Sequence, residues 1–231
     1  MSKSYVHGPA VLTIPRTMTP EGMGELAAAL RAPAEHAYVL TGTASAFCLG
    51  ADLKWLGGLA DPAEGVATLV AAHHEAVLAM RDARVPVISA VNGAAAGGGI
   101  SLALAADYCV ASVSATFTAA YFRLGLTPDG GNSLFLGTRG MELLLTNRTL
   151  TAADALGLRL VAEVAEDVLG RACELAAGFA AAPGETLVQT RRLLAPDLEE
   201  RLRLEEAAVV AAARRPAFQD ALREFLARSS R

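Results

Sequence analysis

Two short turns of small residues stand where backbone N–H groups can reach a ligand. One is the stretch 91–100, which follows the apolar run Pro86–Val91, and the other is the stretch 47–52, which follows Ala37–Thr41. Turns built from Gly and Ala let a backbone N–H come close to a ligand, because no large side chain stands in the way. Two such donors aimed at one oxygen form an oxyanion hole, which stabilises negative charge on a carbonyl group.

The glycine-rich turn also has three other interpretations. The run Gly97–Gly99 is also typical of a tightly packed turn between a strand and a helix. It does not match the dinucleotide-binding pattern G-x-G-x-x-G, since the residues from Gly93 onward read G-A-A-A-G-G-G, and no acidic ribose partner follows in the expected place. No Lys-Ser or Lys-Thr pair follows the glycines, which excludes a Walker loop.

Four segments at a consistent spacing carry a resemblance to a known family. They are Ala46–Leu53, Pro86–Gly99, Gly125–Gly131 and Leu150–Leu158. In this order they resemble the signatures of the crotonase superfamily, the enoyl-CoA hydratase/isomerase family, in register from about Tyr38 to Val164. The resemblance implies an α/β fold, a crotonase-like (ClpP/crotonase) spiral of ββα units. It also implies a core over residues 1–175 and a C-terminal helical region over 176–231 that serves as a trimerisation element or lid.

Composition agrees with an enzyme of this kind. The chain has 231 residues, 53% of them hydrophobic, which is enough for one α/β domain with a core and a helical appendage. With 20 basic and 24 acidic residues it lacks the basic surface of a nucleic-acid-binding protein. We expect no membrane span and no signal peptide, and the three cysteines favour a reducing, cytoplasmic setting. No metal site is expected from the four histidines.

Strands and helices alternate along the chain, which predicts a largely parallel sheet with helices on its faces. From about Ser133 to the end the pattern is helical, with Pro216 separating the last two amphipathic helices. The predicted strands are 6–14, 37–41, 85–91, 108–112 and 116–118, and the predicted helices are 19–30, 63–81, 100–106, 197–213 and 217–228.

The resemblance assigns the oxyanion donors and the ligand. The backbone N–H groups of Ala51 and Gly98 would polarise the thioester carbonyl of an acyl-CoA, with coenzyme A as part of the substrate and no separate cofactor. Ala51 as a plain turn residue is the alternative, and Cys48 is expected to be a packed small residue rather than a nucleophile. Substrate-binding positions are expected at Cys48, Leu49, Gly50, Asp52, Leu53, Trp55, Gly97, Ser101, Tyr121, Pro128 and Gly130.

The group that moves protons is expected at Asp129. The hydratases of the family carry two glutamates where this chain has Ser101 and Tyr121, and neither is a carboxylate. Asp129 stands in a Pro-Asp-Gly-Gly turn, where the family's enoyl-CoA isomerases have an acid. In an apolar pocket its pKa would rise, which suits removal of an α-proton and its return at the γ-carbon. A structural role remains open, because Pro-Asp-Gly is a favourable turn and Asp also caps helices.

Arg123 and two adjacent histidines are the other side chains considered near the site. Arg123 is placed either to orient Asp129 or in an exposed ion pair, and His73 and His74 are expected on the surface, with one of them lining the pocket as the alternative. Near the N-terminus the run Ile14–Arg16 replaces a longer family segment, which puts part of the coenzyme A phosphate contact in doubt.

The predicted function is an isomerase of acyl-CoA thioesters, in a homotrimer or hexamer. Hydration, or a catalytically quiet protein that binds CoA esters, is the alternative.

Overall fold

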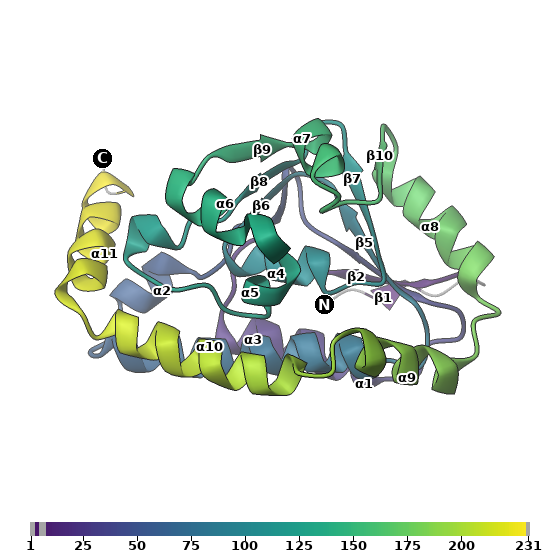
Figure 1. The fold of residues 1–231 in the computed structure, drawn as a ribbon, viewed down its shortest axis with the longest axis horizontal. Coiled ribbons are helices and arrows are strands. Elements are labelled where there is room, and N and C mark those ends of the chain that lie inside the picture. Colours follow the sequence, from purple (N-terminus) through teal and green to yellow (C-terminus); the bar gives the residue numbers. More distant parts are fainter. Residues whose placement is uncertain (1–2, 5–7, 230–231) are drawn as a thin grey trace.

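The fold consists of two sheets that share the same repeating units, described by a computed structural model for residues 3–4 and 8–229 (Figure 1). The larger sheet has the order β1-β2-β3-β5-β7-β10, and the smaller sheet has the order β4-β6-β8-β9. In the larger sheet β1 is antiparallel to β2 and the other pairs are parallel, and in the smaller sheet β9 is antiparallel to β8. The strands are β1 (Lys3–Ser4), β2 (Ala10–Thr13), β3 (Tyr38–Thr41), β4 (Ala46–Cys48), β5 (Val87–Val91), β6 (Ala94–Ala96), β7 (Tyr108–Ser112), β8 (Thr116–Thr118), β9 (Thr149–Thr151) and β10 (Glu163–Ala165).

From β3 to β8, consecutive strands alternate between the two sheets. The strands β3, β5 and β7 lie in the larger sheet, and each is followed a few residues later by β4, β6 or β8 in the smaller one. After β4 and after β6 a helix leads back to the larger sheet, so the ββα unit repeats along the chain. This is the predicted spiral, and it places the turn after β4 next to the turn after β6, because β4 and β6 are paired.

The helices begin largely where the sequence predicts. Thr19 caps the first helix through its side chain, and Pro20 is its first residue, as expected. The helices are α1 (Pro20–Arg31), α2 (Leu53–Gly57), α3 (Pro62–Asp82), α4 (Gly98–Leu104), α5 (Asn132–Phe135), α6 (Gly140–Thr146), α7 (Ala152–Gly157), α8 (Val168–Phe179), α9 (Gly184–Leu194), α10 (Leu198–Ala213) and α11 (Pro216–Ser229), with 3-10 turns η1 (Phe122–Leu124) and η2 (Gly137–Arg139).

Two expectations about the elements were wrong in part. The segment after Ser133 is not helical throughout, because the short strands β9 and β10 add to the two sheets. Three-residue strands are too short to show a period in the sequence. The predicted strand 6–14 is β2, Ala10–Thr13, preceded by the separate strand β1, and residues 5–7 lie outside the described part of the chain.

The larger sheet is covered on both faces, which explains its apolar strands. Along β3, Tyr38 and Leu40 belong to the main core with α1 and α3, while Val39 packs on the other side with α8. Opposite faces of a strand alternate with a period of two residues, so both sets of positions must be apolar when both faces are buried. In Figure 1 α8 lies on one side of this sheet, and α1, α3 and α10 lie together along another.

The C-terminal helices pack on the rest of the same chain. Arg191 of α9 makes an ion pair with Asp107 at 2.6 Å and donates to the carbonyls of Arg81 and Val85 at 3.1 and 3.0 Å. Helix α10 runs along α3, and α11 reaches α2 at the far end (Figure 1). A third apolar cluster joins them, with Leu56, Val66, Val70, Val209, Phe218 and Leu222 among its members. Among the helices within the described residues, none has the length and apolar character that a membrane crossing requires.

Candidate active site

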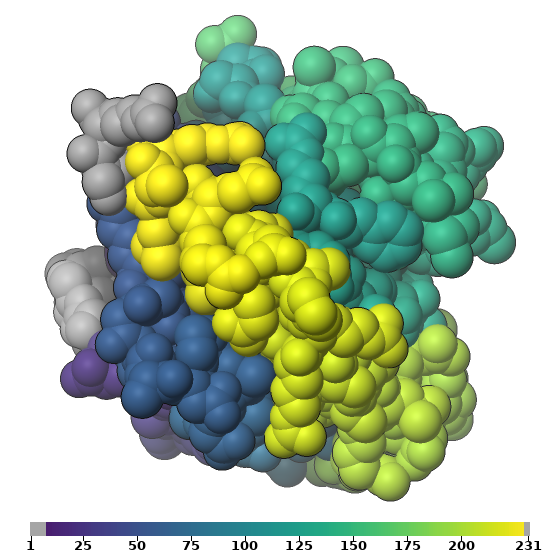
Figure 2. Space-filling model, turned by 90° about the vertical axis from the view of Figure 1, so that its left-hand side faces the viewer, coloured from purple at the N-terminus to yellow at the C-terminus, as the bar shows by residue number. Residues whose placement is uncertain are grey.

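A cavity of about 410 Å³ lies where the two glycine turns meet the C-terminal helices. One side is formed by the turns 49–51 and 97–98, and another by Tyr121 and Asp129. Figure 2 shows the C-terminal helices, in yellow, running across the molecule between blue and teal segments. Much of the remaining wall is aliphatic and includes Leu53, Leu56, Val66, Leu69, Val70, Leu126 and Val209, while Arg123, Glu224, Phe225 and Arg228 also line the cavity. The aliphatic part suits an apolar acyl group.

Glycine lets the two turns approach each other. Gly50 and Gly97 have positive φ values of 79° and 52°, a conformation that side chains disfavour. A Cβ on Gly50 would stand 2.8 Å from the carbonyl oxygen of Ala96 and 3.5 Å from the nitrogen of Gly98. A Cβ on Gly99 would stand 2.1 Å from the carbonyl oxygen of Cys48. The turns therefore touch through backbone atoms.

Ala51 and Gly98 carry the two N–H groups that the sequence predicts as a pair of donors. Met18 donates to the carbonyl of Gly50 at 2.8 Å and accepts from the N–H of Asp52 at 3.0 Å. Since alternate residues of an extended segment point to opposite sides, the N–H of Ala51 points away from Met18. Gly98 is the first residue of α4, where an N–H has no partner within the helix. Both residues line the cavity, which fits the predicted oxyanion hole.

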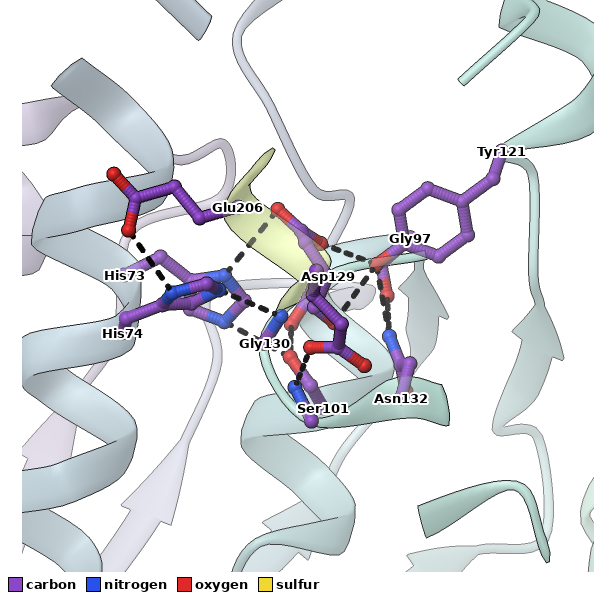
Figure 3. A network of polar contacts seen from close by, with 12 residues as sticks. His73, His74, Gly97, Ser101, Tyr121, Asp129, Gly130, Asn132 and Glu206 are labelled. Atoms are coloured by element: carbon purple, nitrogen blue, oxygen red, sulfur yellow. Dashed lines mark hydrogen bonds and ion pairs between the residues drawn. The ribbon is translucent and has the colours of Figure 1, made fainter. Parts of the chain in front are cut away.

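Asp129 lines the cavity and is almost fully buried. Its Oδ1 accepts a hydrogen bond from the hydroxyl of Tyr121 at 2.6 Å, and its Oδ2 lies 3.8 Å from Nδ1 of His73 (Figure 3). Burial alone raises the pKa of Asp129, but His73 and the Tyr121 hydroxyl together outweigh burial, so the pKa lies below its usual value. The expectation of a raised pKa was therefore wrong, because it considered the apolar pocket without these partners.

Tyr121 is held as a hydrogen-bond donor. Burial and the neighbouring charge of Asp129 raise the pKa of Tyr121 well above its usual value. Its oxygen accepts from Nδ2 of Asn132 at 2.8 Å, and Asn132 also donates to the carbonyl of Gly97 at 3.2 Å. The side-chain amide of Asn132 therefore links the turn at Gly97 to Tyr121, which donates to Asp129.

The spatial order Ser101, His73, Asp129 is that of a nucleophilic triad. The Ser101 hydroxyl, however, does not face the cavity. Its Oγ lies 2.9 Å from Nε2 of His73 and donates to the carbonyl of Gly98 at 2.7 Å. Ser101 and His73 are fully buried and are not among the residues that line the cavity. A Cβ on Gly130 would stand 2.5 Å from the Ser101 oxygen, so the loop covers it. A nucleophile must reach the substrate, and this oxygen does not.

Side chains from two helices hold the loop that carries Asp129. Gly130 donates its N–H to Nε2 of His74 at 3.1 Å, and Gly131 and Ser133 donate to the two carboxylate oxygens of Glu205 at 2.7 and 2.8 Å. Burial raises the pKa of Glu205, a shift that these hydrogen bonds oppose and the charge of Asp129 reinforces. Helix α10 therefore supports the position of Asp129 directly.

The burial of His74 makes stability depend on the protonation of its ring. Burial, with the charge of His73, lowers the pKa of His74 to about 4. An unfolded histidine titrates near pH 6.5, so between these values the unfolded chain binds more protons, and stability falls as the pH falls from about 6.5 to about 4. At ~1.4 kcal/mol for each pKa unit, the full loss is ~3 kcal/mol.

His74→Gln tests this prediction, since the glutamine oxygen can accept from Gly130 but does not titrate. Urea unfolding of both proteins at pH 7 and pH 4.5 should show a larger loss of unfolding free energy in the parent. Glu205 titrates in both proteins and cancels in the comparison. Equal losses in the two proteins would contradict the assignment.

The structure brings together some of the predicted substrate-binding residues and not others. Those that line the cavity with the donors and Asp129 are Leu49, Gly50, Leu53, Gly97 and Tyr121. The others are not among the residues that line the cavity, namely Cys48, Asp52, Trp55, Ser101, Pro128 and Gly130.

Two of the residues that do not line the cavity have evident structural roles. The Asp52 side chain caps α2 and accepts from Thr17 at 2.8 Å. Cys48 is fully buried, and burial raises the pKa of its thiol to about 11. Arg123 lines the cavity and donates to the carbonyl of Asn147 at 3.3 Å, an interaction that the sequence did not suggest.

Four functional candidates were missed or misplaced from the sequence. His73 and His74 are buried, whereas they were expected on the surface. The signal was present in α3, where apolar residues occupy almost every face, so a histidine among them is buried too. Glu205 lies at the same helical spacing as the buried Leu202 and Val209, which marks it as a core-facing position. Asn132 carried no signal in the sequence.

Comparison with known proteins gives the family. The model of the enoyl-CoA hydratase/isomerase family matches residues 9–224. The chain belongs to this family. The match confirms the predicted family and, together with the structure described above, the crotonase fold. As a member, the protein is an acyl-CoA-processing enzyme of the enoyl-CoA hydratase/isomerase family.

Individual relatives of this enoyl-CoA hydratase/isomerase family member agree with the match. A protein of Mycobacterium tuberculosis named "Probable enoyl-CoA hydratase EchA14" is 39% identical over 184 residues, 75% of this chain and 71% of that protein. A "4-chlorobenzoyl coenzyme A dehalogenase-1" of Arthrobacter is 38% identical over 157 residues, 64% of this chain and 56% of that protein. A solved enoyl-CoA hydratase/isomerase of Mycobacterium paratuberculosis superposes with a TM-score of 0.83 at 26% identity, covering 95% of this chain and 96% of that one.

Proposed function

We propose that the enzyme moves the double bond of an enoyl-CoA, with Asp129 as the single acid/base group. The carbonyl oxygen of the thioester would accept from the N–H groups of Ala51 and Gly98. The carboxylate of Asp129 takes a proton from the α-carbon, and the electron pair of that C–H bond forms an enolate whose charge rests on the carbonyl oxygen. Asp129 then returns the proton at the γ-carbon, which leaves the double bond conjugated with the thioester.

One observation carries this proposal: among the described residues, the cavity is lined by two acidic side chains, and Asp129 is the buried one. The other, Glu224, is exposed and pairs with Arg228 at 3.1 Å. Isomerisation needs one group that removes and returns a proton. Hydration needs further help to activate water, and the two positions where hydratases carry glutamates hold Ser101, which is covered, and Tyr121, which is held as a donor.

The cavity supports an acyl group of moderate size. Its volume of about 410 Å³ lies within the range of small-ligand pockets, and its aliphatic wall favours a hydrocarbon chain over a polar group. The ionised state of Asp129 also fits the first step, because a base must be deprotonated before the substrate arrives.

A second candidate follows from one relative and the same carboxylate. The Arthrobacter protein is named a dehalogenase of 4-chlorobenzoyl-CoA. An ionised, buried carboxylate is a possible nucleophile as well as a base, so Asp129 suits displacement of a halide from an aromatic acyl-CoA. Because much of the cavity wall is aliphatic, it suits a hydrocarbon chain better than an aromatic acyl group, and we place this candidate below isomerisation.

Ultraviolet absorbance of the conjugated enoyl thioester tests the proposal. Purified protein given a 3-enoyl-CoA of medium chain length should produce a rise in absorbance, and a 2-enoyl-CoA should give no fall. A fall with the 2-enoyl-CoA alone would replace the proposal with hydration. Chloride release from 4-chlorobenzoyl-CoA without a rise would replace it with dehalogenation, and no change with any of the three would favour a protein that binds CoA esters without turnover.

A further inference from the structure

Two backbone carbonyls next to the oxyanion donor fix the direction of the surrounding hydrogen bonds. A carbonyl oxygen can only accept, so the Asn132 atom 3.2 Å from the oxygen of Gly97 must be its nitrogen. That nitrogen also donates to the oxygen of Tyr121, whose own hydrogen then goes to Oδ1 of Asp129 at 2.6 Å. The other acceptor near this hydroxyl, the backbone oxygen of Asp129, is 3.5 Å away. Oδ1 is therefore occupied as an acceptor, and Oδ2 remains for chemistry.

The second carbonyl orients the histidine in the same way. Ser101 gives its hydrogen to the carbonyl of Gly98 at 2.7 Å, so its oxygen must accept from Nε2 of His73 at 2.9 Å. His73 thus carries a proton on Nε2. Its Nδ1 has no hydrogen-bond partner among the described residues and lies 3.8 Å from Oδ2 of Asp129 (Figure 3).

A bare Nδ1 facing a carboxylate oxygen would place two lone pairs opposite each other in a buried site. A proton between the two groups removes this repulsion. Because Oδ1 already accepts a strong hydrogen bond, the carboxylate form of Asp129 is favoured, and the proton rests on the histidine. The neighbouring ionisable groups are His74, whose Nε2 accepts from Gly130, and Glu205 and Glu206 of α10.

We propose that His73 is a built-in counter-ion of Asp129, a positioning residue that carries protons on both ring nitrogens and keeps the carboxylate ionised when an acyl group displaces water from the cavity. A carboxylate that loses its water in an apolar site otherwise takes up a proton and ceases to be a base. Asn132 orients the Tyr121 hydroxyl toward Oδ1 of Asp129. Oδ2 is therefore left as the oxygen that meets the substrate proton. The catalytic role of His73 rests on the proposed function above, but its protonation state does not.

Nitrogen-15 NMR of the full chain labelled at histidine tests the protonation state without any substrate. At pH 7 His73 should show protons on both nitrogens, while His74 should show a single proton on Nδ1, because its Nε2 accepts from Gly130. In Asp129→Asn the charge that retains the second proton is gone, so His73 should become neutral with its proton on Nε2. A neutral His73 in the parent would overturn the proposal. Spectra of His73→Gln, His74→Gln and His36→Gln assign three of the four histidine signals, and the remaining one belongs to His7.

Kinetics of His73→Gln test the role in turnover. The glutamine amide can still donate to Ser101, but it carries no charge, so kcat should fall ~100-fold with KM within about 3-fold of the parent. His36 is a half-buried residue between α1 and β3 and does not line the cavity, so the control His36→Gln should match the parent. An unchanged kcat in His73→Gln would overturn the counter-ion role. If no enoyl-CoA is turned over by the parent, the proposed function fails while the NMR result still decides the protonation state.

Discussion

Asp129→Asn should lower kcat for a 3-enoyl-CoA by about 10³-fold and leave binding of the CoA ester nearly unchanged. Asparagine has almost the same shape and its oxygen can still accept from Tyr121, but it cannot take a proton at the pH of the assay. The oxyanion donors are backbone groups and remain in place. Turnover followed by ultraviolet absorbance and binding followed by calorimetry would separate the two effects.

Asp167→Asn is the matched control for this substitution. Asp167 caps α8 through its bond from the N–H of Gly170, away from the cavity, and its loss should leave kcat unchanged. If Asp129→Asn kept kcat within about 3-fold of the parent, the general-base role of Asp129 would be wrong. The loop 129–133 would then be a structural turn, the alternative that the sequence left open.

Gly99→Ala should reduce kcat by 10²-fold or more and destabilise the fold, because the new methyl group has nowhere to go. It would stand 2.1 Å from the carbonyl oxygen of Cys48 and 2.8 Å from its carbon, and neither backbone atom can move without the turn that carries Ala51. Loss of one oxyanion donor costs about 3 kcal/mol of transition-state stabilisation, and overpacking a core costs about 1–3 kcal/mol of stability.

Gly24→Ala provides the comparison for Gly99→Ala. The same methyl group on the exposed Gly24 of α1 meets no atom within 4 Å. It should leave kcat unchanged and raise the unfolding free energy by about 0.5–1 kcal/mol, because alanine is the better helix former. Thermal unfolding and steady-state kinetics of the two variants give both quantities. Parental kcat in Gly99→Ala would show that the two turns do not act as one oxyanion hole.

The parts of the site that the sequence predicts are those made by short, local patterns. The glycine turns after Val91 and Thr41 follow directly from residue types, since close backbone approach requires glycine whatever the rest of the fold does. The cap at Thr19 and the strands around β5 and β7 are local in the same sense.

The parts that the sequence does not predict depend on partners distant along the chain. Asp129 was expected with a raised pKa because the pocket was known only as apolar, while His73 stands 56 residues away in the sequence. The depressed pKa of Asp129 comes from how α3 packs against the loop, and no local pattern contains that distance. Glu205 was visible as a core-facing position, but which amides it would meet depends on where α10 docks.

The bonds from Gly131 and Ser133 to Glu205 span 74 and 72 positions of the chain. During synthesis, the loop that carries Asp129 leaves the ribosome long before its acceptors do. Until residue 205 has emerged and α10 has docked, two amides of that loop have no carboxylate to bind, and the loop is held only by partners that precede it in the chain. The loop that carries Asp129 therefore gains its last support late in synthesis, when a helix more than 70 positions downstream docks against it.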